Sequence, residues 1–243
     1  MAAEELGRIS RPQAGDVATR RKLYIVPLVY PIPGAPDGYA SRLEKYWKAV
    51  DEQVSRLEGR AGVVSHVFHE GIGHSGQTAL DELKQVNMPA FPFVNSRVQA
   101  GATMDALEDE DLLAEAVDWG RCLQIGLQSE SVFNLVNEKY TKVTEARFEH
   151  ISKRLNDGLS KGEAAVLIVA DTRGIKTPDK AEVFNIVPPE LDQLSRWLQE
   201  QFQREAAAAQ GADVQPGAQQ QDQTPQEPAG GTTRESGLWT PGR

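Results

Sequence analysis

Hydrophobic positions along the chain follow two different periods, and the change from one to the other predicts a series of strands and helices. Short runs rich in β-branched and aromatic residues predict strands, at residues 23–30, 63–69, 90–94, 164–170 and 182–187. Apolar residues that recur every three or four positions predict helices, at about residues 39–57, 77–86, 106–127, 130–158 and 189–205. The run at 164–170 is apolar throughout, which is typical of a central strand buried on both faces.

The order of these elements predicts the fold class. Strands that alternate with helices favour an α/β protein with a mostly parallel mixed sheet of about five strands and helices on both faces. The last two strands, 164–170 and 182–187, have no helix between them and could pair antiparallel. The helices at 106–127 and 130–158 follow one another directly and could form a long helical pair.

Composition divides the chain into four parts. Residues 1–21 are polar and charged without a hydrophobic period, so they predict a disordered arm. Residues 22–205 carry the periodic pattern and predict a single α/β domain. Residues 206–235 are rich in Ala, Gln, Gly and Pro and predict a disordered linker, because such a segment cannot bury enough apolar surface to offset its ordering entropy.

The tail at residues 236–243 returns to large apolar side chains after a linker that avoids them. Trp is strongly enriched at the hot spots of protein interfaces, and a flexible linker of this length reaches several nanometres. The tail therefore predicts a short docking motif for a protein partner, formed by Leu238, Trp239 and Pro241. The alternative is that these residues fold back onto their own domain.

Composition and charge exclude several classes of protein. The 243 residues are 40% hydrophobic and 25% charged, with a net charge of −9. This charge repels a phosphate backbone, so we expect no nucleic-acid binding. No apolar run reaches the roughly 20 residues of a membrane span, no segment resembles a signal peptide, and Cys122 is the single cysteine. We expect a cytoplasmic protein without membrane contact; its oligomeric state stays open.

The densest candidate chemistry lies in residues 63–76, VVSHVFHEGIGHSG, which indicate a strand that runs into a glycine-rich turn. Three of the four histidines, His66, His69 and His74, fall in this stretch together with Glu70. Ligand sites of α/β sheets lie at the carboxyl ends of the strands. The turn after the second strand is therefore the first place to look for a site.

Three kinds of site compete at this turn with a plain tight turn and surface histidines. Glu70 and His69 could perform acid–base catalysis in a small-molecule hydrolase. His69 and His74 could ligate zinc, manganese or iron, which would make such a hydrolase metal-dependent. A further protein ligand would then come from elsewhere, such as Asp118 or His150. The identity of any metal or other cofactor is open.

The third kind of site is a phosphate loop. Gly71, Gly73 and Gly76 have the spacing G-x-G-x-x-G between a strand and a helix, where backbone amides can hold a nucleotide phosphate. Arg97, after the next predicted strand, could contact a further phosphate. Glu70 counts against this interpretation, because its charge would repel a pyrophosphate.

One segment resembles part of a known family. FEHISKRLNDGLSKGEAAVLIVAD, residues 148–171, is similar to the helix-then-strand segment of release-factor and Pelota-type domains. The resemblance implies a helix followed by a buried strand and no particular activity. From the residues alone, the first hypothesis is a non-catalytic binding or adaptor protein whose tail docks a partner; the hydrolase and the nucleotide-phosphate site are the alternatives.

Overall fold

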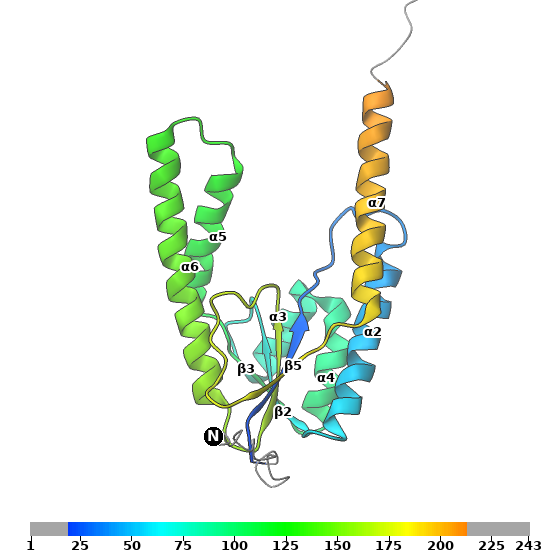
Figure 1. Ribbon diagram of the computed structural model, residues 1–243, viewed down its shortest axis with the longest axis vertical. Coiled ribbons are helices and arrows are strands. Elements are labelled where there is room, and N and C mark those ends of the chain that lie inside the picture. Colours follow the sequence, from blue (N-terminus) through cyan, green and yellow to red (C-terminus); the bar gives the residue numbers. More distant parts are fainter. Residues whose placement is uncertain (1–18, 213–243) are drawn as a thin grey trace, which may run out of the picture. The chain divides into compact units, whose positions relative to one another are not determined.

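A parallel sheet forms the centre of the computed structural model, which describes residues 19–212 (Figure 1). Its strands have the order β3-β2-β4-β1-β5, and every pairing between neighbours is parallel. The strands are β1 (Lys22–Pro27), β2 (Val64–His69), β3 (Thr103–Asp105), β4 (Ala164–Val169) and β5 (Glu182–Asn185). β4 is buried along its whole length, as its apolar run predicts, and the α/β class is confirmed.

Helices cover both faces of the sheet. They are α2 (Tyr39–Glu58), α3 (Gly76–Val86), the short 3-10 helix η1 (Met88–Ala90), α4 (Phe91–Gln99), α5 (Glu110–Gln124), α6 (Glu130–Gly158) and α7 (Pro189–Ala212). On one face, α2, α3, α4 and the start of α7 pack on Tyr24 and Val26 of β1. On the other face, α6 packs on Leu23 and Ile25. Successive residues of a strand point to opposite faces, so β1 supplies both cores.

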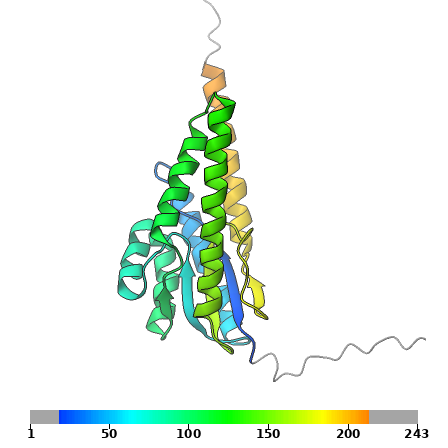
Figure 2. The same cartoon turned by 90° about the vertical axis from the view of Figure 1, so that its left-hand side faces the viewer.

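The α5–α6 hairpin is the predicted long helical pair. Figures 1 and 2 show it extending past the edge of the sheet at which the strands end. The compact unit Met1–Phe202 contains the sheet and this hairpin, and a second unit covers Gln203–Arg243. None of the helices in residues 19–212 combines the length and the apolar character that crossing a bilayer requires.

The strand predicted at 90–94 is wrong, because this segment forms η1 and the first turn of α4. A short apolar run does not distinguish a strand from a buried helical turn. Pro89 and Pro92 fit here, because the first turn of a helix leaves its N–H groups unbonded and proline has none to lose. The third strand is instead the short β3, which pairs with β2.

The antiparallel pairing suggested for the last two strands is also wrong. β5 lies beyond β1 and runs parallel to it, with Lys22 opposite Glu182. The loop 170–181 connects the end of β4 to the start of β5. A loop of this length, at about 3.3 Å for each extended residue, carries the chain back along the full sheet, so no tight turn forces the strands to reverse.

α7 continues to Ala212, past the end predicted at residue 205. The added residues are mainly alanines, which are the strongest helix formers. The predicted linker therefore begins with a helical segment, because a lack of large apolar side chains does not prevent a helix. The tail motif at Leu238, Trp239 and Pro241 and the arm up to residue 18 lie outside the described residues, and their predicted roles stay predictions.

Candidate functional site

The glycine-rich turn after β2 is joined to the loop that precedes α5. The carbonyl oxygen of Ile72 accepts hydrogen bonds from the backbone N–H groups of Leu107 (3.0 Å) and Glu108 (3.1 Å). The hydroxyl of Ser75 accepts one from the backbone N–H of Ala106 (2.7 Å). Two loops from distant parts of the sequence are therefore held as one structure at the carboxyl ends of the strands.

α5 starts later than the predicted residue 106. The backbone N–H groups of residues 106–108 donate to the turn after β2, so this segment runs along the turn before the helix begins. Asp109 becomes the cap instead, and its carboxylate accepts a hydrogen bond from the backbone N–H of Leu112 (3.0 Å). Such a cap satisfies one of the free N–H groups at a helix start.

Glu70, a predicted catalytic residue, has both carboxylate oxygens engaged. One oxygen accepts a hydrogen bond from the backbone N–H of Ala170 (2.6 Å), and the other forms an ion pair with Arg147 of α6 (2.9 Å). The Arg147 guanidinium also donates to Glu108, with 2.8 Å from its Nε to the carboxylate. The Glu108 side chain is completely buried, and it also accepts a hydrogen bond from the backbone N–H of Gly71 (3.1 Å).

Arg147 is therefore the centre of a partly buried ionic cluster with Glu70 and Glu108. Burial alone would lower the pKa of the Arg147 guanidinium, but its hydrogen bonds to Glu108 and Glu70 and the charges of both carboxylates outweigh burial and raise that pKa. The guanidinium stays charged, which keeps the two carboxylates compensated. This arrangement positions the turn; a catalytic role for Glu70 stays a prediction.

Tyr30 completes this side of the turn. Its hydroxyl donates to the backbone carbonyl of Glu70 (3.2 Å), and its own carbonyl accepts a hydrogen bond from the Tyr39 hydroxyl (2.6 Å). Burial, together with the charges of Glu70 and Glu108, raises the pKa of Tyr30 to about 12. The phenol is therefore a hydrogen-bond donor at neutral pH.

His69, a predicted catalytic residue and metal ligand, is fully buried at the end of β2. Its Nε2 lies 3.4 Å from the side-chain nitrogen of Asn87, and its Nδ1 has no hydrogen-bond partner among the described residues. Burial lowers the pKa of His69 to about 4, so the ring is neutral at neutral pH. The ring offers no surface that a substrate or a solvent ion could reach.

His66 lies between two carboxylates that approach opposite nitrogens of its ring. Its Nδ1 is 2.8 Å from Asp105 at the end of β3, and its Nε2 is 3.3 Å from Glu163 before β4. Ligands of one metal ion must meet at a single point, so these two carboxylates cannot share an ion with His66. The group links neighbouring strands through polar side chains.

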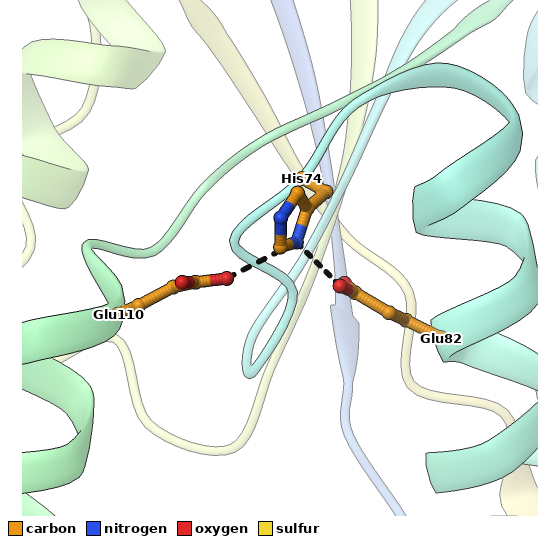
Figure 3. Close-up of side chains that lie close together, drawn as sticks. All are labelled: His74, Glu82 and Glu110. Atoms are coloured by element: carbon orange, nitrogen blue, oxygen red, sulfur yellow. Dashed lines mark ion pairs between the residues drawn. The ribbon is translucent and has the colours of Figure 1, made fainter.

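His74 differs from the other two histidines because it lies near the surface between two helices (Figure 3). Its Nδ1 is 2.5 Å from a carboxylate oxygen of Glu82 in α3 and 3.1 Å from one of Glu110 in α5. Of the two histidines predicted as metal ligands, only His74 belongs to a group with metal-ligand geometry.

The three glycines of the turn are explained by its backbone geometry. Gly71 and Gly76 have φ angles of +87° and +67°, which favour glycine. A Cβ atom at Gly73 would lie 2.8 Å from Cγ of Glu110. The N–H of Gly71 is already engaged by Glu108. The pattern G-x-G-x-x-G therefore has a structural cause that requires no phosphate.

Arg97, the predicted partner of a phosphate, lies elsewhere. Arg97 lies in α4, since residues 91–99 form a helix and not the predicted strand. Its buried guanidinium pairs with Asp51 and Glu58 of α2. It also donates to the hydroxyl of Ser55 (2.9 Å). The structure thus does not bring Arg97 to the glycine turn, and the phosphate hypothesis loses its cation.

A cavity of about 520 Å³ lies between the base of the α5–α6 hairpin and the carboxyl edge of the sheet. Tyr140 and Thr144 of α6 face it, and its charged lining residues are Glu70, Arg121, Arg147 and Asp171. Its volume is within the range of small-molecule sites. Glu70 and Arg147 pair with each other, whereas Asp171 pairs with Arg173 outside the cavity wall.

Two residues of the site, Arg147 and Glu82, carried no signal in the sequence, whereas Glu110 belongs to the acidic start of the predicted helix 106–127, whose alternative interpretation is a docking or metal face. Arg147 is 77 positions from Glu70, inside a long helix with charged residues throughout. Glu82 and Glu110 occupy helix positions where glutamate is common. The glycines of the turn were the sequence feature that indicated a close approach by another element.

Fold and site together define an α/β protein with a rigid ionic cluster at the carboxyl edge of its sheet. Comparison of the chain with protein-family models, curated proteins and solved structures finds no match. The function is therefore argued from the described residues.

Proposed function

We propose that this protein is a binding protein that recruits a partner protein, and that the α5–α6 hairpin is its docking element. One observation carries the proposal. Large apolar side chains on this hairpin are between 41 and 74% exposed, namely Val117, Ile125, Val132, Phe133 and Leu135. Exposed apolar side chains that gather on one element mark interaction sites, whereas single ones are common on any protein surface.

The hairpin cannot bury these side chains by itself. In α5 only Ala116 is fully buried, and in the outer half of α6 only Val136 and Val143 are. Among the described elements, α6 is the main packing partner of α5, and the hairpin extends past the end of the sheet (Figure 1). Helices usually bury their apolar stripes in bundles of more than two, so a further helix would complete this one.

The charges on α5 suggest the chemistry of that further helix. α5 exposes the carboxylates of Glu110, Asp111, Glu115 and Asp118, against the single cation of Arg121. An amphipathic helix with an apolar stripe and basic flanks matches this surface in both respects. We therefore take the occupant to be a basic amphipathic helix of a partner protein.

Two further parts of the proposal rest on the sequence. The tail would supply a second contact with the partner through Leu238, Trp239 and Pro241. A linker would tether this tail to the domain. A cytoplasmic location agrees with Cys122 as the single cysteine. The metal-dependent hydrolase remains the alternative function, because His74 is exposed at the turn beside two carboxylates. The nucleotide-phosphate alternative lacks Arg97, which pairs with α2 instead.

The test compares the full chain with the double variant Val132→Ser/Leu135→Ser. Proteins retained by the wild type and lost by the variant are purified and titrated against both chains. We expect a loss of affinity of about 1–3 kcal/mol and a weakening of binding with added salt. Val187→Ser, another exposed apolar position outside the hairpin, is the matched control and should bind normally.

Two outcomes would overturn the proposal. The first is equal binding of the partner by the wild type and the double variant. The second is a dimer of the purified chain alone, detected by sedimentation, that the double variant abolishes, because the occupant would then be a second copy. Deletion of residues 213–243, which leaves α7 whole, tests the tail contact separately.

A further inference from the structure

We propose that His74, Glu82 and Glu110 form a binding site for a divalent transition-metal ion such as Mn²⁺ or Zn²⁺. Among the described residues these three form the group whose ligand atoms all lie within 4.8 Å of one another. The inference goes beyond the docking function. Its three ligands converge at the turn, and Glu110 is the one residue that it shares with the acidic surface of α5 in the docking proposal.

The geometry around His74 fits one central ion. Two ligands of an ion with bonds of about 2.1 Å lie roughly 3.0–3.4 Å apart in octahedral or tetrahedral coordination. His74 Nδ1 and the Glu110 oxygen are 3.1 Å apart, within this range, and Nδ1 and the Glu82 oxygen at 2.5 Å need only a small side-chain adjustment. Both carboxylates point at the same nitrogen (Figure 3), unlike those around His66.

The carboxylates of Glu82 and Glu110 both approach Nδ1 of His74, and one proton on Nδ1 cannot neutralise both of them. Nδ1 can carry one hydrogen, so it makes one strong hydrogen bond and leaves the second carboxylate with a weaker, shared contact. A divalent cation between the three side chains accepts the lone pair of Nδ1 and neutralises both carboxylates at once. The ion would also replace the repulsion between Glu82 and Glu110 with a shared attraction.

The three side chains are held by separate rigid elements. His74 belongs to the turn that Ile72 and Ser75 tie to the loop before α5. Glu82 lies in α3 and Glu110 in the first turn of α5. Gly73 admits the Glu110 side chain to the turn, because a Cβ there would lie 2.8 Å from its Cγ. The ligands are thus positioned by the fold before an ion arrives.

The ligand types select the class of metal. One imidazole nitrogen with two carboxylates suits Mn²⁺, Fe²⁺, Co²⁺ or Zn²⁺, whereas Mg²⁺ and Ca²⁺ favour sites made of oxygen alone. The side chains of His74, Glu82 and Glu110 are 48%, 31% and 66% exposed. The remaining coordination positions would therefore face solvent and hold water.

The experiment is titration of the purified full chain with MnCl₂ and with ZnCl₂ by calorimetry, after removal of metal with a chelator. We expect one ion per chain. His74→Ala, Glu82→Gln and Glu110→Gln should each weaken the affinity by about tenfold or more. Asp111→Asn, an exposed carboxylate beside Glu110 on α5, and His150→Ala on α6 are matched controls and should bind as the wild type does.

Two further measurements distinguish a loss of metal ligation from a loss of folding. Circular dichroism should give the same helix content for all five variants, since these side chains are partly or fully exposed. Mn²⁺ should broaden the ring signals of His74 in NMR spectra and leave those of His150 sharp. Absence of binding to the wild type, or equal weakening by Asp111→Asn and Glu110→Gln, would overturn the site and leave an ordinary ion pair.

Discussion

Gly73 lies directly against Glu110, so closely that a Cβ atom at residue 73 would be 2.8 Å from Cγ of that glutamate. The contact joins the turn after β2 to the first turn of α5. It makes the glycine a spacer that lets a carboxylate approach His74. The glycine spacing that resembles a phosphate loop thus serves, in this fold, to bring an acid to the turn.

This relationship predicts the effect of Gly73→Ala. The added methyl group should displace the Glu110 side chain and weaken Mn²⁺ binding, with a loss of stability of about 1 kcal/mol from overpacking. Gly76→Ala is the control: it has open space around its Cβ position but a φ of +67°, so it should cost about 1 kcal/mol through the backbone alone. Calorimetric titration and urea unfolding of both variants measure the difference. Equal metal affinities in the two variants would contradict the spacer role.

The ionic cluster predicts a large effect of Arg147→Met. The substitution leaves the buried carboxylate of Glu108 without its cation, which should destabilise the protein by about 3–5 kcal/mol. Arg121→Met on α5 removes an arginine that is 73% exposed and should change stability by less than about 0.5 kcal/mol. Urea unfolding measures both values.

A companion variant identifies the cause of that loss. Arg147→Met combined with Glu108→Gln removes the uncompensated buried charge and should recover part of the lost stability. If the double variant is as unstable as Arg147→Met or less stable, the loss comes from packing around Arg147 and not from its charge.

Buried His69 predicts a dependence of stability on pH. Its pKa is lowered on folding from 6.5 to about 4, so the unfolded chain binds the proton more tightly. The stability contributed by the neutral ring is fully present above pH 6.5 and is lost as the pH falls towards 4, by about 3 kcal/mol in total. Urea unfolding across this range measures the slope.

The variant His69→Gln isolates this contribution from that of the carboxylates. It cannot take up the proton, so its stability should fall less steeply between pH 6.5 and 4. Identical slopes for the wild type and His69→Gln would show that the ring is not buried in solution as it is in this structure.

The hairpin predicts that docking and stability separate at neighbouring residues. Leu135 is 54% exposed and Val136 is buried. Leu135→Ser should change the free energy of unfolding by less than about 0.5 kcal/mol while weakening partner binding. Val136→Ser should destabilise the protein by about 2 kcal/mol. Thermal unfolding of both variants is the measurement, and a strong loss of stability in Leu135→Ser would mean that its side chain packs inside the chain.

Local patterns in the sequence were sufficient for elements whose burial repeats regularly. In α2, periodicity places Tyr39, Leu43, Trp47, Val50, Val54 and Leu57 on one face. The first five are buried against the sheet, and Leu57 at the end of the helix is partly buried. The apolar run of β4 marked a central strand for the same reason. The segment 90–94 was too short to show a period, and its prolines suit a helix start as well as a strand edge.

The partners of the polar side chains were decided by the tertiary structure alone. Glu70 meets Arg147 and His74 meets Glu110 because loops and helices from separate parts of the chain converge at one edge of the sheet. Charged side chains are compatible with many surface positions, so their spacing in sequence does not reveal which ones are paired or buried. The sequence by itself determined the α/β class and the place of the candidate turn. Only packing determined that His69 is enclosed and His74 faces two carboxylates, because burial depends on what covers a residue and not on its neighbours along the chain.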